Sequence, residues 1–109
     1  MQAGRVLDVK VAEALGYEVG KFPPDYYIVV DGEIETLPQF STTWKGMGVL
    51  VEEAIKKQDV YLKLEADPHG GYEAGAWDER EWRNYGPMTS DSVPHAVCMA
   101  FRKAIRVTI

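Results

Sequence analysis

The residue pair best suited to covalent chemistry lies near the end of the chain, where Cys98 follows His95 by three positions. At that spacing on one helix an imidazole can lie beside a thiol and accept its proton, which would activate a cysteine nucleophile. No third group that would orient the imidazole is evident in the sequence. Because a free cysteine most often packs as a small apolar side chain, we expect Cys98 to lie in the core. We therefore expect a protein that is not an enzyme.

Metal ligands and phosphate-binding loops are represented only by isolated residues. His69, His95 and Cys98 would have to combine with carboxylates such as Asp67 or Asp91 from distant segments, and no closely spaced pair of ligands anchors such a site. The glycine-rich stretch 68–71 lacks the lysine of a phosphate-binding loop, and a hairpin turn accounts for it better. We expect neither a metal nor a cofactor.

A cluster of aromatic and arginine residues in the last third is the strongest candidate for a binding site. Aromatic faces can stack on a nucleobase, guanidinium groups bind phosphate in a forked geometry, and free amides at a helix start, here residues 89–92, bind anions. Cross-strand packing beneath a helix is the alternative, and it is the more common fate of aromatic residues in a sheet. The candidate ligand-binding residues are Tyr61, Trp77, Arg80, Trp82, Arg83, Tyr85, Ser90 and Ser92.

Composition limits the classes of partner. The 109 residues, 46% of them hydrophobic and 27% charged, are typical of one globular domain spanning residues 1–109. The net charge of −5, with the bases scattered, argues against binding DNA or RNA. One cysteine excludes an internal disulfide, and no apolar run is long enough for a signal peptide or a membrane span. We therefore expect a cytoplasmic protein that binds no membrane.

Hydrophobic periodicity predicts three helices. The first covers residues 2–15 and ends at Gly16, and the second begins at Ser41 as its cap. The third follows a cap at Asp91 or Ser92 and tolerates Pro94 in its first turn. The predicted buried stripe of the second helix is Trp44, Met47, Val51, Ala54 and Ile55, and that of the third is Val93, Val97, Phe101, Ala104 and Ile105.

Strand patterns fill the segments between the helices. Asp31 and Gly32 favour a type I′ turn between strands 26–30 and 33–37, after a connector at 21–25 that contains two prolines. Alternation predicts further antiparallel strands at 60–65, 72–77 and 82–85, the last ending before Gly86 and Pro87. Helices separated by antiparallel hairpins indicate an α+β layered domain.

Segments 4–17, 40–44 with 50–54, and 94–104 together resemble the small phage proteins grouped as the phage ABA sandwich domain. Four residues depart from the family pattern, namely Phe40, Thr43, His95 and Val97. The resemblance implies a helix–sheet–helix (ABA) sandwich with a mainly antiparallel sheet and a phage or prophage origin. It supplies no established activity.

The function that we expect from these observations is ligand binding by a small phage accessory protein. The ligand class is a small nucleotide-like molecule, and sequestration of a host defence signal is the role suggested by analogy with other phage proteins. The alternative is a protein–protein interaction factor that inhibits or adapts a host protein. Because antiparallel hairpins leave an unpaired edge, we also expect a homodimer.

Overall fold

Two antiparallel three-stranded sheets and three helices make up the part of the chain that the computed structural model describes, which is residues 2–23, 25–66, 68, 70–78 and 83–108. The predicted α+β class is confirmed. The described strands form two sheets, where the sequence suggested one. In chain order the elements are α1 (Arg5–Ala14), β1 (Glu18–Phe22), β2 (Asp25–Val30), β3 (Glu33–Thr36), α2 (Trp44–Gln58), β4 (Val60–Ala66), β5 (Tyr72–Asp78), β6 (Arg83–Ser90) and α3 (Val93–Thr108).

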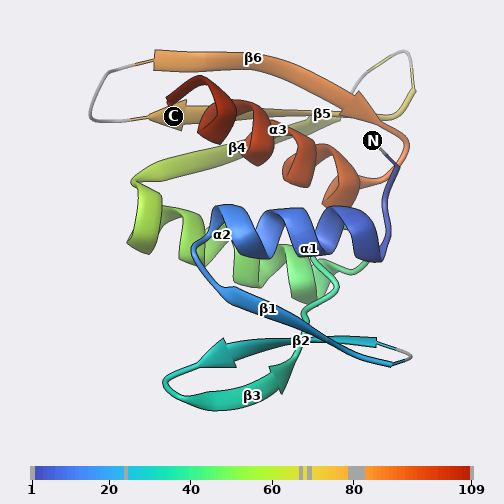
Figure 1. Cartoon of the computed structure of the whole chain (residues 1–109). Helices are drawn as coiled ribbons and strands as arrows, with labels where there is room; N and C mark the ends of the chain where they lie inside the picture. Colours follow the sequence, from blue (N-terminus) through green and yellow to red (C-terminus); the bar gives the residue numbers. More distant parts are fainter. Residues whose placement is uncertain (1, 24, 67, 69, 79–82, 109) are drawn as a thin grey trace.

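The elements are stacked in layers around α3. Figure 1 shows α3 along the β4–β5–β6 sheet, with α1 and α2 on the opposite side of α3 and the β1–β2–β3 sheet beyond them. Helix α3 contacts all three strands of its sheet and both other helices, so it forms the centre of the core. Its predicted buried stripe, from Val93 to Ile105, is confirmed, and Phe101 is fully buried. Within the described residues no helix is long and apolar enough to cross a membrane.

The first sheet contains the predicted hairpin and one strand that the sequence did not reveal. Asp31 and Gly32 both have positive φ angles, 51° and 81°, as a type I′ turn requires. Residues 21–25, which we expected to be a connector, instead end β1 and begin β2. The ring of Tyr27 packs on the bare backbone of Gly20, its partner across the two strands, where any Cβ atom would collide with it.

Helix α2 buries only part of the predicted stripe, since Ala54 is buried and Met47 and Val51 pack against the core, but Trp44 and Ile55 do not. Its buried residues are Gly46, Leu50 and Ala54, whereas Trp44 is 63% exposed and Ile55 is 36% exposed. The reason is the close crossing of the preceding segment, because the backbone of Gln39 lies where a side chain at Gly46 would be. Gly46 therefore faces the core, because only a residue without a side chain fits there. The predicted stripe was wrong at Trp44 and Ile55.

The cap of α2 was also assigned to the wrong residue. The hydroxyl of Thr43 accepts a hydrogen bond from the amide of Gly46 at 2.9 Å, which is the usual N-cap geometry. Ser41, the predicted cap, is instead fully buried and bonds to residues of α1.

The second sheet holds the candidate site. Strand β4 pairs with β5 over seven residue pairs, from Val60 with Asp78 to Ala66 with Tyr72. Strand β6 runs on to Ser90, well past the predicted end before Gly86, because a register shift between Ala74 and Ala76 accommodates extra β6 residues. Such a bulge lets a strand continue through glycine and proline, which regular pairing disfavours.

Candidate functional site

The two faces of the β4–β5–β6 sheet differ in what they carry. Side chains alternate along each strand, and the face that packs on α3 holds Val60, Ala74 and Ala76, all buried. On the other face, within the described residues, no helix or strand is packed (Figure 1). We call this second face the outer face; in β4 and β5 it carries Tyr61, Lys63, Glu65, Glu73, Gly75 and Trp77.

Tyr61 and Trp77 form the aromatic centre of the outer face. They are direct partners in the β4–β5 register, and their ring centroids lie 5.7 Å apart with the ring planes tilted by 50°. Both side chains are half-buried. A shallow cavity of about 270 Å³ is lined by these two residues together with Leu62 and Lys63. That volume lies just below the range of typical small-molecule pockets, so it suits one planar ring system better than a large ligand.

Two further candidate residues, Arg83 and Tyr85, belong to β6 beside this pair. The residue of β6 that pairs with Trp77 is Asn84. Arg83 pairs with Asp78 and Tyr85 pairs with Ala76, so by alternation their register positions belong to the α3 side of the sheet and not to the outer face. Arg80 and Trp82, the other candidates in this stretch, lie outside the described residues.

Ser90 and Ser92 lie at the opposite end of the sheet from the aromatic pair. Ser90 pairs with Tyr72, which is about 17 Å along β5 from Trp77 at the usual rise per strand residue. The hydroxyl of Ser90 lies 2.8 Å from Nδ1 of His95 and accepts a hydrogen bond from the amide of Ser92 at 3.1 Å. The structure therefore separates these serines from the aromatic pair and uses them to join β6 to α3.

Cys98 does not have the surroundings of a nucleophile. The residue is fully buried. Burial, and secondarily the charge of Asp8, raises the pKa of its thiol far above the ordinary value. A thiol in this environment stays protonated and inaccessible, so the expectation that Cys98 packs in the core is confirmed. Among the described residues no group of three histidine, cysteine or acidic side chains is placed to hold a metal ion.

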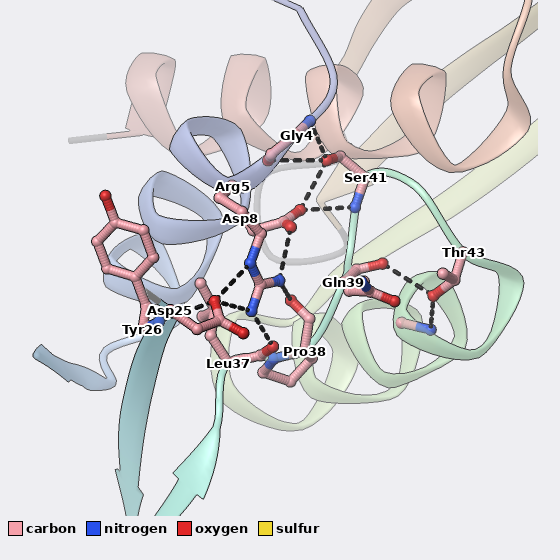
Figure 2. Close-up of polar contacts among 11 residues, drawn as sticks. Gly4, Arg5, Asp8, Asp25, Tyr26, Leu37, Pro38, Gln39, Ser41 and Thr43 are labelled. Carbon is pink, nitrogen blue, oxygen red and sulfur yellow. Dashed lines mark hydrogen bonds and ion pairs between the residues drawn. The ribbon is translucent and has the colours of Figure 1, made fainter. Parts of the chain in front are cut away.

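A buried polar network, which was not predicted from the sequence, joins α1 to the segment between β3 and α2 (Figure 2). The carboxylate of Asp8, which is fully buried, accepts hydrogen bonds from the hydroxyl of Ser41 at 2.6 Å and from its amide at 2.8 Å. The same hydroxyl accepts a hydrogen bond from the amide of Gly4 at 2.9 Å. The network contains an acid, a hydroxyl and a guanidinium, yet all three are occupied by protein partners.

Arg5 is the cation of this network. It donates to Asp8 at 3.0 Å, to Asp25 at 2.9 Å, and to the backbone carbonyls of Leu37 and Pro38 at 2.7 and 3.3 Å. One side chain thus holds together α1, the start of β2 and the chain that leaves β3. We assign the network to the fold and not to ligand binding. The signal available in the sequence was Asp8 itself, an acid beside Leu7 on the apolar face of α1.

Comparison of the chain with protein-family models, with curated proteins and with solved structures finds no match to any of them.

Proposed function

We propose that this protein is a small non-enzymatic binding domain that holds a planar, phosphate-bearing ligand of the nucleotide class on the outer face of the β4–β5–β6 sheet. The observation that carries the proposal is the half-buried pair of Tyr61 and Trp77 on a face that the described residues leave uncovered. An aromatic pair needed only for packing would be expected against α3, on the side where the core lies.

Stacking supplies the binding energy in this proposal. A base stacked on an aromatic side chain contributes about 1–3 kcal/mol, whichever base it is. Phosphate recognition in this proposal falls to Arg80, which lies outside the described residues, because the register position of Arg83 belongs to the α3 side of the sheet. Ser90 and Ser92 no longer belong to the proposed site, because they lie at the far end of the sheet.

The biological role follows from the resemblance to phage ABA sandwich proteins and is part of the same proposal. Three sequence blocks support it, at residues 4–17, 40–44 with 50–54, and 94–104. The protein would act in the bacterial cytoplasm as an accessory factor that sequesters a nucleotide-like host defence signal. The helix–sheet–helix arrangement of that family would need a second helical layer on the outer face, whereas the three described helices all lie on the α3 side of the β4–β5–β6 sheet (Figure 1).

A thermal-shift screen against mononucleotides, dinucleotides and cyclic nucleotides tests the proposal. A ligand at 100 times its Kd stabilises the native state by about 2.7 kcal/mol, which raises the Tm of a domain of this size by several degrees. Tyr61→Ala and Trp77→Ala should each weaken binding about tenfold or more. Trp44→Ala is the matched control, because Trp44 is an exposed aromatic residue on α2, away from the site.

Arg80→Ala should weaken the binding of a phosphate-bearing ligand and leave the circular dichroism spectrum unchanged. If no nucleotide shifts the Tm, or if Trp77→Ala and Trp44→Ala weaken binding equally, the aromatic pair is a packing pair. The interaction factor that targets a host protein would then be the function to pursue.

A further inference from the structure

Strand β4 is an unpaired edge of its sheet. The strand order is β4–β5–β6, so the backbone groups on one side of β4 have no partner strand among the described residues. The last four residues of β4, from Lys63 to Ala66, are all exposed, including Leu64 at 39%. An open edge of this kind readily accepts another strand, and a protein normally either protects it or uses it.

The charges along β4 select one way in which the strand can pair with a second copy of itself. In an antiparallel pair related by a two-fold axis, residues facing each other have numbers that are both odd or both even. A centre at Leu64 places Lys63 opposite Glu65 of the second copy, twice by symmetry, with Leu64 opposite Leu64 and Leu62 opposite Ala66. From Leu62 to Ala66, opposite charges or apolar side chains then face each other at every pair, and beyond this stretch Tyr61 faces Asp67 by sequence position alone.

The neighbouring registers all bring like charges together. A centre at Lys63 places Lys63 against itself, and a centre at Glu65 does the same for Glu65. A centre at Leu62 sets Asp59 against Glu65, and a centre at Ala66 sets Glu65 against Asp67, by sequence position alone. Only the Leu64 register combines opposite charges with an exposed leucine at its centre.

The edge strand β3 provides an internal comparison. All four of its residues are exposed, and it also has a partner on one side only. A two-fold centre at Ile34 sets Glu33 against Glu35, and a centre at Glu35 sets that residue against itself. Charged residues on an edge strand commonly prevent pairing with another chain. The acidic residues of β3 therefore disfavour its self-pairing, whereas the mixed charges of β4 permit it.

We propose that two copies of this chain associate along β4, antiparallel and centred on Leu64, into one continuous six-stranded sheet. The two cross-strand ion pairs between Lys63 and Glu65 set the register. Because the register depends on Lys63, Leu64 and Glu65 and not on stacking by Tyr61 and Trp77, this inference can hold or fail independently of the ligand proposal. The two outer faces would become one surface that carries both aromatic pairs.

Charge exchange tests the register directly. Lys63→Glu sets acid against acid, and Glu65→Lys sets base against base, so each variant should raise the dimer Kd by about tenfold or more. The double variant Lys63→Glu with Glu65→Lys restores opposite charges and should dimerise like the unmodified chain. Sedimentation equilibrium over a range of protein concentrations measures the Kd, and circular dichroism shows that each variant is folded.

Matched controls come from α2, where Lys56 and Glu52 are exposed. Lys56→Glu and Glu52→Lys make the same changes in net charge away from the edge and should leave the dimer Kd within about twofold. In addition, Leu64→Cys should form an intermolecular disulfide under mild oxidation, because the two sulfurs would meet at the two-fold axis, while the buried Cys98 stays reduced.

The proposal is wrong if the unmodified chain remains a monomer at all concentrations tested. It is equally wrong if the chain dimerises but the double variant does not recover the dimer affinity that the single variants lose. A dimer indifferent to all of these changes would place the interface on another surface.

Discussion

Asp8 and Ser41 are separated by 33 residues in the chain and joined by two hydrogen bonds in a fully buried site, at 2.6 and 2.8 Å. The carboxylate of Asp8 also accepts a hydrogen bond from the guanidinium of Arg5 at 3.0 Å. Buried charges persist only when they are paired and fully hydrogen-bonded, and this one meets both conditions. The pair fixes how the chain leaves the first sheet and enters α2.

Asp8→Ala should therefore be among the most destabilising substitutions in the chain. It removes the acceptor for Arg5 and for both donors of Ser41, and breaking a buried ion pair typically costs about 3–5 kcal/mol. Urea denaturation monitored by circular dichroism measures the loss. Asp25→Ala removes the other, half-exposed partner of Arg5 and should cost much less stability than Asp8→Ala, because solvent screens an exposed ion pair. Equal losses in the two variants would contradict the assignment.

Asp25 should contribute stability that depends on pH. Its pKa is lowered, first by the hydrogen bond from the amide of Tyr26 and then by Arg5. A carboxyl whose pKa is lower in the folded state stabilises the fold above its ordinary pKa, and the contribution is lost as pH falls through the lowered value. The free energy of unfolding of the unmodified protein should therefore approach that of Asp25→Asn as the pH falls below about 4. A difference that stays constant over this range would exclude the linkage.

Gly46 and Gly48, two residues apart on α2, should respond to alanine in opposite directions. A Cβ at Gly46 would collide with the backbone of Gln39, whereas a Cβ at Gly48 meets no other atom within 4 Å. Gly46→Ala should destabilise by about 1–3 kcal/mol. Gly48→Ala should stabilise by about 1 kcal/mol, because alanine has the higher helix propensity. Thermal unfolding of both variants measures the two changes in stability. A change of the same sign in both would contradict the close packing of Gly46 against Gln39.

Trp44→Ala should change stability by less than about 1 kcal/mol, because the side chain is 63% exposed. If Trp44 were buried, as the amphipathic pattern predicts, the same substitution would cause a large loss of stability. Leu50→Ala, at a fully buried position of the same helix, should instead cost about 2–5 kcal/mol. Chemical denaturation of the two variants distinguishes the observed buried face of α2 from the predicted one.

Cys98 should react with a thiol reagent only after the protein unfolds. Its thiol is fully buried and its pKa is raised, so neither access nor thiolate formation favours reaction. At about pH 8 the native protein should show almost no release of thionitrobenzoate from Ellman's reagent, and one equivalent should appear in denaturant. Rapid reaction of the native protein would show that the thiol is accessible.

Local patterns predicted the fold well where the deciding interactions lie within a few residues. The Asp31–Gly32 turn follows from backbone preferences at two positions, and the buried stripe of α3 follows from period 3.6 alone. Strand β1 was not predicted because the contacts that stabilise it come from another segment. It pairs with β2, where the ring of Tyr27 packs on Gly20. The face of α2 was misjudged for the same reason, since the crossing of Gln39 over Gly46 leaves no local signal.

The candidate site was predictable to the same extent. Alternation placed Tyr61 on one face of β4, and the hairpin register brings Trp77 opposite it. The position of Ser90 depends on the length of β6. The predicted strand was too short, because Gly86 and Pro87 were taken to end it. The role of Asp8 needed the tertiary partner Ser41, which no pattern within α1 indicates.

The bulge in β6 limits how far such a sheet can extend. Two copies joined through β4 consume both of those edges, and each remaining outer edge is a β6 strand whose register is broken between the partners of Ala74 and Ala76. Pro87, in that interval, has no amide hydrogen to offer a newcomer. If two chains pair through β4 as proposed, the β6 edges would therefore disfavour the addition of a further strand to the six-stranded sheet.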